Sequence, residues 1–220
     1  MKLVLASGSQ RRRELLTMCG YDYEIIVSNA DETIDENDPE SFVRALSFRK
    51  AKEVFDRLFA AGRRDFAVIG SDTVVAFQKE GETKPVIIGK PKDAEDAVRI
   101  LSMLSGKTHR VFTGVSVIAD IPDENAAAQC SIRKKAEIQT ECSITEVTFE
   151  TLSPDEIADY VNSGDPLDKA GSYGIQGPFG MFVREIRGNY FTVIGMPIPV
   201  LYKMLKKIGI LPHGFYERIE

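Results

Sequence analysis

The chain has 220 residues, of which 43% are hydrophobic and 28% are charged, and its formal net charge is −5. A chain of this length and apolar content can bury a core, and we expect a single domain over residues 1–220. The acidic balance argues against a general nucleic-acid binder, and no apolar run approaches the roughly 18 residues that suggest a membrane span.

The cysteines and histidines limit the possible metal sites. Cys19, Cys130 and Cys142 have no metal-type spacing, and we interpret them as reduced thiols of a cytoplasmic protein. The N-terminus also lacks the apolar stretch and cleavage site of a secretory signal. Because His109 and His213 are far apart in the sequence, any metal should be a hard cation held by carboxylates.

Strand-like and helix-like segments alternate along the chain, which indicates an α/β fold. Ser9 and Gly20 are expected to bound the first helix, and Ser153 with Glu156 forms a capping box for a later one. In chain order we expect a strand at 2–7, a helix at 10–19, a strand at 23–29, a helix at 39–61 and a strand at 66–77, whose apolar run is interrupted at 70–72. A hairpin-like loop at 79–86, a helix at 93–106, a strand at 108–120 and an irregular segment at 121–135 follow. The last predicted elements are a strand at 136–152, a helix at 153–164, a hairpin at 180–195 and a closing helix at 197–209.

The stretch that links the first strand to the first helix predicts an anion site. Backbone N–H groups and the helix dipole favour negative charge at a helix N-terminus. Ser7, Gly8 and Ser9 are small enough to let a phosphate approach closely, and Arg11 and Arg12 add bidentate donors. Positive side chains at this end oppose the dipole unless an anion is bound, so the alternative of a solvated basic turn is less favourable.

Two acidic positions follow predicted strands. Asp72 interrupts the apolar run at 66–77, and a buried acid is rare unless it is paired, so we interpret it as catalytic rather than structural. Glu32 can supply a second carboxylate, with Asp31 as the competing choice. The acid run at 31–40 is also consistent with a solvated loop.

Lysines and a glycine-rich loop supply further candidates. Lys90 precedes a proline and a helix, and it becomes a phosphate contact if it lies beside the anion site. Lys50 is a second candidate phosphate contact, although helical spacing cannot distinguish it from Lys52. Glycines recur every third residue from 171 to 180, which is typical of backbone that turns tightly or approaches a ligand. Polar groups mounted on this segment include Asp168, Lys169 and Gln176, and the glutamine amide can read the edge of a base.

Long motifs in this sequence together resemble the Maf family of nucleotide pyrophosphatases, in order and spacing, from residue 3 to residue 197. The motifs are "LASGSQRRRELL", "GSDTVV", "GKPKDAEDA", "LSGKTHRVFTGV", "PLDKAGSYGIQG" and "VREIRGNYFTVIGMP". The resemblance implies an α/β fold like that of the inosine triphosphate pyrophosphatases, with a long mixed β-sheet and flanking helices that form two lobes around a cleft. It also implies a homodimer.

The implied reaction is metal-dependent hydrolysis of a nucleoside triphosphate to the monophosphate and pyrophosphate. The loop "DKAGSYGIQG" is similar to that of the dTTP/UTP-hydrolysing subgroup, in which the positions of Arg11, Thr73 and Gln176 distinguish substrates. Asp72 stands at the position of the family's proton acceptor. We expect Asp72 and Glu32 to hold Mg²⁺ or Mn²⁺, and a phosphate-binding set of Ser7, Ser9, Arg11, Arg12, Lys50 and Lys90.

Other functions stay open at this point. One is a non-catalytic nucleotide-binding regulator of cell division, and another is a pyrophosphatase of the 7-methyl-GTP type. The chain also departs from the family pattern, because Gln10 replaces a usual proline and the segments at about 79–88 and 120–140 look like surface insertions.

Overall fold

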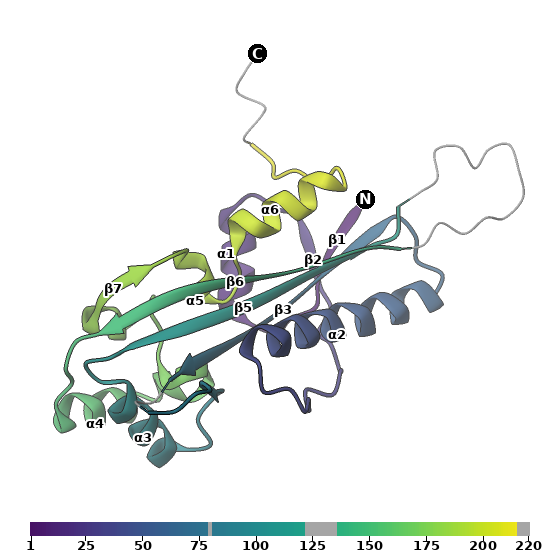
Figure 1. The fold of residues 1–220 in the computed structure, drawn as a ribbon. Helices are drawn as coiled ribbons and strands as arrows, with labels where there is room; N and C mark the ends of the chain where they lie inside the picture. The colour runs from purple at the N-terminus through teal and green to yellow at the C-terminus, as the bar shows by residue number, and fades with distance from the viewer. Residues whose placement is uncertain (79–80, 122–135, 215–220) are drawn as a thin grey trace, which may run out of the picture.

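The computed structural model describes residues 1–78, 81–121 and 136–214 (Figure 1). They form a seven-stranded mixed sheet flanked by helices, which confirms the predicted α/β class. The strands are β1 (Lys2–Leu5), β2 (Tyr23–Ile25), β3 (Phe66–Phe77), β4 (Val86–Ile88), β5 (Thr108–Ala119), β6 (Glu137–Phe149) and β7 (Val183–Arg187). The α-helices are α1 (Gln10–Met18), α2 (Pro39–Ala60), α3 (Ala94–Leu104), α4 (Pro154–Asn162), α5 (Tyr190–Ile194) and α6 (Ile198–Lys207), and the 3₁₀ helices are η1 (Asp165–Asp168), η2 (Ala170–Ser172) and η3 (Pro178–Phe182).

The order of the strands leaves a gap along one edge of β3. The sheet runs β2-β1-β3-β5-β6-β7, with β4 also paired to β3. On that edge β1 pairs in parallel with residues 66–69, and β4 pairs antiparallel with residues 75–77. Within the described chain, no strand covers residues 70–74 on this side. The chain therefore leaves room for a ligand beside the middle of its central strand.

Helix α2 lies close against one face of β3 and β5 (Figure 1). A Cβ at Gly70 would lie 2.2 Å from the carbonyl oxygen of Ser47, and one at Gly114 would lie 2.2 Å from that of Val43. Real Cβ atoms do not approach this closely, so the helix can reach the sheet only because both positions lack a side chain.

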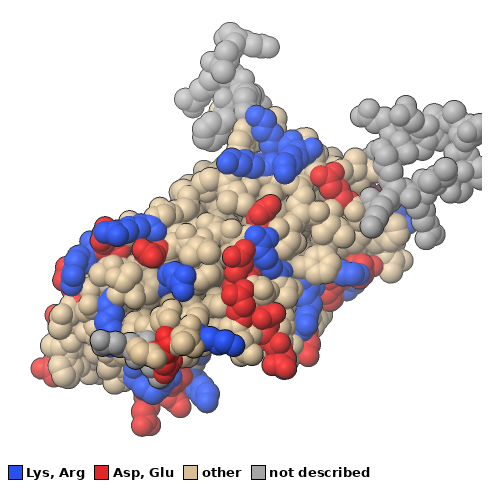
Figure 2. Space-filling model, viewed as in Figure 1, with Lys and Arg blue, Asp and Glu red and all other residues tan. Residues whose placement is uncertain are grey.

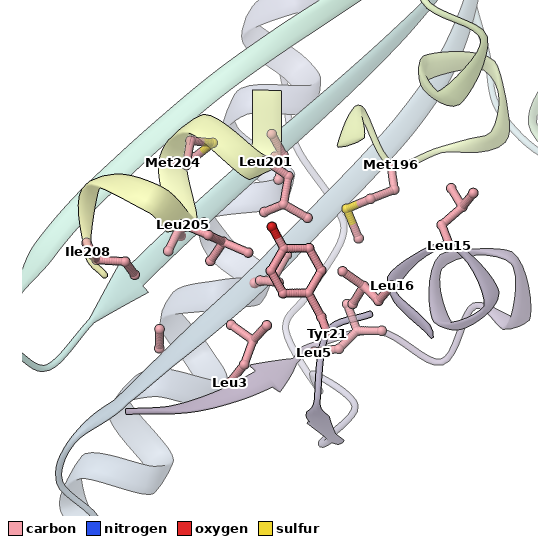
Figure 3. Packing of buried hydrophobic residues seen from close by; sticks show 14 of the residues in the cluster. Leu3, Leu5, Leu15, Leu16, Tyr21, Met196, Leu201, Met204, Leu205 and Ile208 are labelled. Atoms are coloured by element: carbon pink, nitrogen blue, oxygen red, sulfur yellow. The ribbon is translucent and has the colours of Figure 1, made fainter. Parts of the chain in front are cut away.

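The opposite face is covered by α1 and α6. Figure 3 shows Leu201 and Leu205 of α6 packed near Tyr21, with Leu16 of α1 on the other side of the ring. These apolar side chains are nearly inaccessible to water, and their burial stabilises this face of the sheet. At the far end of the sheet, α3 and α4 enclose a second apolar cluster that includes Phe149 (Figure 1).

One predicted strand is confirmed over its whole length, and one predicted segment is wrong. Residues 66–77 form β3 although the apolar run is interrupted at 70–72, and Gly70 pairs with Ser116 and Asp72 with Gly114 in an uninterrupted ladder. The glycine in this run admits α2. The predicted hairpin at 180–195 is wrong: after η3, β7 is followed by α5, whose first turn is capped by the Asn189 side chain.

The two suspected insertions lie at strand connections. The hairpin-like reading of 79–86 is confirmed in part, since β3 and β4 pair antiparallel on either side of it. Residues 79–80 and 122–135 lie outside the described residues, and so does Cys130. Cys19 and Cys142 are free thiols, as predicted. None of the described helices is long and apolar enough to cross a membrane.

The close approach of α2 generates a stability prediction. Gly114→Ala forces the new Cβ against the Val43 carbonyl, so the helix or the strand must shift. We expect the free energy of unfolding, measured in urea, to fall by about 3 kcal/mol or more. Gly89→Ala is the matched control, because no atom lies within 4 Å of its added Cβ. Equal stabilities of the two variants would show that α2 packs elsewhere.

Candidate active site

A cleft of about 730 Å³ opens beside the unpaired edge of β3. Five cationic and three acidic side chains line it, so its local charge is positive although the chain is acidic overall. On the face seen in Figure 2, side chains of both signs are exposed, and basic ones gather over α6 at the top of the view. All the site residues predicted from the sequence line this one cleft: Ser7, Ser9, Arg11, Arg12, Glu32, Lys50, Asp72, Thr73, Lys90, Asp168, Lys169 and Gln176.

The N-terminus of α1 forms one end of the cleft. Ser7 is buried, and its Oγ accepts from the Ser9 backbone N–H at 3.2 Å. Ser9 occupies the predicted N-cap position, but its side chain makes no capping hydrogen bond. The first turn carries no acidic residue. Backbone donors and the positive end of the dipole therefore face a ligand here without an internal anion at the helix end.

Arg12 is held by acceptors of its own chain. Its Nε donates to the Gly195 carbonyl at 2.8 Å, and its terminal nitrogens donate to Ser7 Oγ at 3.1 Å and Thr73 Oγ1 at 3.3 Å. Burial lowers the pKa of Arg12, while the nearby charge of Asp72 opposes that shift. A guanidinium has five N–H donors, so Arg12 keeps two for a ligand. The side chain thus ties α1 to β3 and to the end of α5 as well as facing the cleft.

Asp72 and Lys50 form a nearly buried ion pair on the face of β3 that α2 covers. Lys50 Nζ donates to Asp72 Oδ1 at 2.7 Å and also lies 3.0 Å from Glu32 Oε1. Asp72 is 8% exposed, so its charge needs this partner. The structure distinguishes the two candidate lysines, because Lys52 pairs with Asp56 on the exposed side of α2.

The loop before α2 also distinguishes the two candidate acids. The Asp31 carboxylate accepts from the Thr33 backbone N–H at 2.9 Å, and this hydrogen bond lowers the pKa of Asp31. Arg49 then donates to the backbone carbonyls of both residues. With Asp31 used to shape the turn, it is Glu32 that reaches the cleft and Lys50.

The carboxylates of Glu32 and Asp72 suit a hard cation. Both are bound to one ammonium group, so their oxygens converge on a single small volume that already favours positive charge. No group of three or more metal-ligating side chains occurs among the residues that the structure describes. A Mg²⁺ site needs only one or two protein carboxylates when phosphates and water complete its shell. The donor set therefore fits such an ion bound together with a phosphorylated ligand.

The glycine-rich segment forms the wall opposite α1. Asp168 accepts from Arg11 at 3.3 Å and from Lys169 at 2.7 Å, so the contact between Asp168 and Arg11 bridges the cleft. Partial burial alone would raise the pKa of Asp168, but its bonds and charge contacts with Lys169 and Arg11 bring it below the ordinary value. Lys90, after β4, and Gln176 complete this wall.

Several residues behind the wall carry no signal in the sequence. Tyr173 lines the cleft, and its hydroxyl lies 3.0 Å from Nε2 of the buried His109. Tyr160 of α4 binds the backbone of Gly174. The helical pattern at 153–164 identifies Tyr160 as a core position but cannot show what its hydroxyl meets. The apolar part of the lining was missed for the same reason, and it includes Phe42, Leu46, Val74, Val75, Ile87, Val111 and Ile175.

Comparisons with known proteins cover nearly the whole chain. The sequence model of the family described as "Maf-like protein" matches residues 2–208. A protein of Agathobacter rectalis named dTTP/UTP pyrophosphatase is 40% identical over 95% of this chain and 98% of its own length. One of the same name from Bacillus thuringiensis subsp. konkukian is 42% identical over 95% and 96%. The solved structure of the Staphylococcus aureus Ham1 protein covers 94% of this chain and 99% of its own at 14% identity, with a TM-score of 0.47.

The buried His109 generates a prediction for stability against pH. Burial lowers its pKa from an ordinary 6.5 to about 3, so below pH 6.5 the unfolded chain takes up a proton that the folded protein does not. The free energy of unfolding should therefore fall as the pH is lowered from 6.5 to 4.5, by about 2 kcal/mol from this group. His109→Gln retains a polar side chain but does not titrate, and its loss over this range should be smaller by that amount.

Urea unfolding at several pH values measures both proteins. Every other titratable group is the same in the two proteins, so its contribution cancels in the comparison. Parallel pH dependences of the two proteins would contradict a neutral buried His109.

Proposed function

Because the chain belongs to the Maf family, we propose that it hydrolyses nucleoside triphosphates to the monophosphate and pyrophosphate, with dTTP and UTP preferred. The relatives that carry this name share 40–42% of their residues with it over almost their full lengths. The observation that carries the proposal is the Asp72–Lys50 ion pair at the centre of a cationic cleft. This arrangement supports the proposal, because Asp72 would act as an acid–base group beside donors that suit a triphosphate.

The phosphate chain is assigned to the α1 end of the cleft. The backbone donors at Ser9 and beyond, the free N–H groups of Arg12 and the Arg11 side chain suit phosphate oxygens. A bound triphosphate competes with Asp168 for Arg11, since the separation of 3.3 Å in that ion pair is long for a charged hydrogen bond. Lys90 adds positive charge where pyrophosphate would leave.

Asp72 is the general base of the proposed reaction. One carboxylate oxygen accepts from Lys50, and the other can accept a proton from a water aimed at the α-phosphorus. The water oxygen forms a bond to the α-phosphorus as the bond to the bridging oxygen breaks, and pyrophosphate departs with that oxygen. Lys50 keeps the carboxylate oriented toward the cleft during this step.

We further propose that the reaction depends on a divalent cation, Mg²⁺ or Mn²⁺. Glu32 and Asp72 would hold it, and the ion would offset the charge of the phosphates and polarise them. Lys50 must then yield part of its contact with these carboxylates. Its exposed fraction of only 12% keeps the ammonium close by, where it can turn toward a phosphate oxygen instead.

Base recognition is assigned to the loop that carries Gln176. Thymine and uracil both present a ring N–H between two carbonyl oxygens, and one amide can bind the N–H and a carbonyl together. They differ by one methyl group, which a hydrophobic pocket distinguishes by only about 1–3 kcal/mol. One site can therefore accept both pyrimidines.

Two alternatives stay distinct from this proposal. A 7-methyl-GTP-type enzyme would share the phosphate end and differ at the loop that carries Gln176, so a substrate panel separates the two. A regulator that binds nucleotides without hydrolysis would have no use for the nearly buried Asp72 at the cleft, whose burial is costly. The homodimer implied by the resemblance stays a prediction.

The proposed base preference predicts the outcome of a substrate panel. Pyrophosphate release with Mg²⁺ should be fastest for dTTP and UTP, slower for dATP, dGTP and 7-methyl-GTP, and lost when EDTA removes the cation. Gln176→Ala removes the amide and should lower the preference for pyrimidines by about tenfold, while the rate on the best substrate falls less.

Two results of this substrate panel would contradict the proposal, each in a different part. If 7-methyl-GTP or a purine nucleotide is cleaved fastest, the pyrimidine preference is refuted and the pyrophosphatase activity stands. If the purified protein releases no pyrophosphate from any member with either Mg²⁺ or Mn²⁺, the proposed activity itself is refuted.

Asp72→Asn tests the general base. The substitution preserves the size of the side chain and removes its charge, so kcat should fall by about 10²-fold or more. Nucleotide binding, measured by calorimetry, should largely survive. Asp31→Asn is the control, because it makes the same chemical change in a side chain that shapes a turn outside the cleft lining. Near-normal turnover of Asp72→Asn would remove Asp72 from the chemistry.

A further inference from the structure

One hydroxyl group holds the wall of the cleft that carries Gln176. Tyr160 extends from α4, at the end of the sheet where α3 and α4 lie (Figure 1), and is only 6% exposed. Its hydroxyl donates to Asp165 Oδ2 at 2.5 Å and accepts from the Gly174 backbone N–H at 3.1 Å. A helix of the core is therefore hydrogen-bonded to this loop at two points, Asp165 and Gly174.

The contact between Tyr160 and Asp165 also positions Lys169, one of the cationic side chains that line the cleft. The second oxygen of Asp165 accepts from Lys169 Nζ at 3.0 Å, and that ammonium also donates to Asp168 at 2.7 Å. The stem of Lys169 crosses the face of Gly174 so closely that a Cβ there would lie 2.6 Å from Cε. The position of the ammonium group and the path of the loop backbone are therefore set together.

The single proton of the tyrosine hydroxyl determines the direction of its two hydrogen bonds. A tyrosine hydroxyl has a single proton, and here that proton goes to the carboxylate of Asp165 while a lone pair receives the N–H of Gly174. Burial, followed by the hydrogen bond to Asp165, raises the pKa of Tyr160, so the proton is retained throughout the neutral range. A phenylalanine ring fills the same volume and makes neither bond.

We propose that Tyr160 is a positioning residue for base recognition: its hydroxyl sets Gly174, and with it Gln176, and through Asp165 it sets Lys169. This inference takes its substrate from the proposed function. The hydrogen bonds of Tyr160 to Asp165 and Gly174 do not depend on that function. Tyr160 is not among the residues that line the cleft, so it acts through the loop and does not touch the nucleotide.

Tyr160→Phe is the direct test. The ring contact with Phe179, at 4.8 Å between centroids, is available to phenylalanine, so the core should survive. We expect the KM for dTTP and UTP to rise about tenfold, the size expected from losing a hydrogen bond to a charged group. The kcat should change by less than about threefold, because the hydrogen bonds and ion pairs given above for Asp72 and Lys50 involve no residue of this loop. The preference for pyrimidines over dGTP should fall, and the Gly174 amide should exchange with deuterium faster.

Two further variants separate the parts of this role. Asp165→Asn weakens the hold on Lys169 but leaves the Tyr160 hydroxyl able to bind Gly174, so the KM should rise while Gly174 stays protected. In the double variant, the increases in KM should be less than multiplicative, because both changes act on one chain of contacts. Tyr190→Phe is the matched control, since this tyrosine is 41% exposed on α5, and it should behave as wild type.

The outcomes distinguish this inference from the function on which it rests. Tyr160→Phe with wild-type KM and wild-type preference overturns the positioning role, even if its Tm is lower, because a purely structural residue would lower Tm alone. If the wild-type protein cleaves no nucleotide, the proposed function fails. Amide exchange at Gly174 then decides the inference: faster exchange in Tyr160→Phe supports it, and unchanged exchange overturns it.

Discussion

The cleft depends on one edge of β3 being left unpaired between β1 and β4. Side chains of a strand alternate between the two faces of a sheet. Neighbouring residues of β3 in this gap therefore contact different faces of the sheet. Asp72 binds Lys50 of α2 on one face, and Thr73 binds Arg12 and Thr113 on the other. A ligand beside this edge can reach the groups of both layers, which a fully paired strand would keep apart.

Close packing of α2 then determines the electrostatics of the site. Glycines at 70 and 114 let the helix backbone come into contact with the strands, and Lys50 lies one residue before Ala51, whose backbone N would be 2.7 Å from a Cβ at Gly70. This proximity brings the ammonium onto Asp72, and the pair offsets the cost of burying either charge. Glu32 joins the same ammonium from the preceding loop, so two carboxylates that are far apart in the sequence meet at one point of the cleft.

Local signals in the sequence were strong enough to predict most of the elements. Ser153 and Glu156 form the capping box that the pattern predicts for α4. The hairpin expected at 180–195 failed because the structural role of a turn-forming residue depends on its partners. Gly70 interrupts the apolar run of β3 without interrupting the strand, and it admits α2. Asn189 caps α5 instead of forming a hairpin turn.

The sequence by itself determined which stretches line the cleft, because strand ends, helix N-termini and glycine-rich loops are local features with local signatures. Only the tertiary structure decided between Lys50 and Lys52, since spacing along a helix does not say which side meets a sheet. Only the fold, likewise, gave the hydroxyl of Tyr160 its two partners. Those partners lie on a loop whose path is set by packing against other elements, and such contacts between distant segments leave no periodic or compositional trace in the chain.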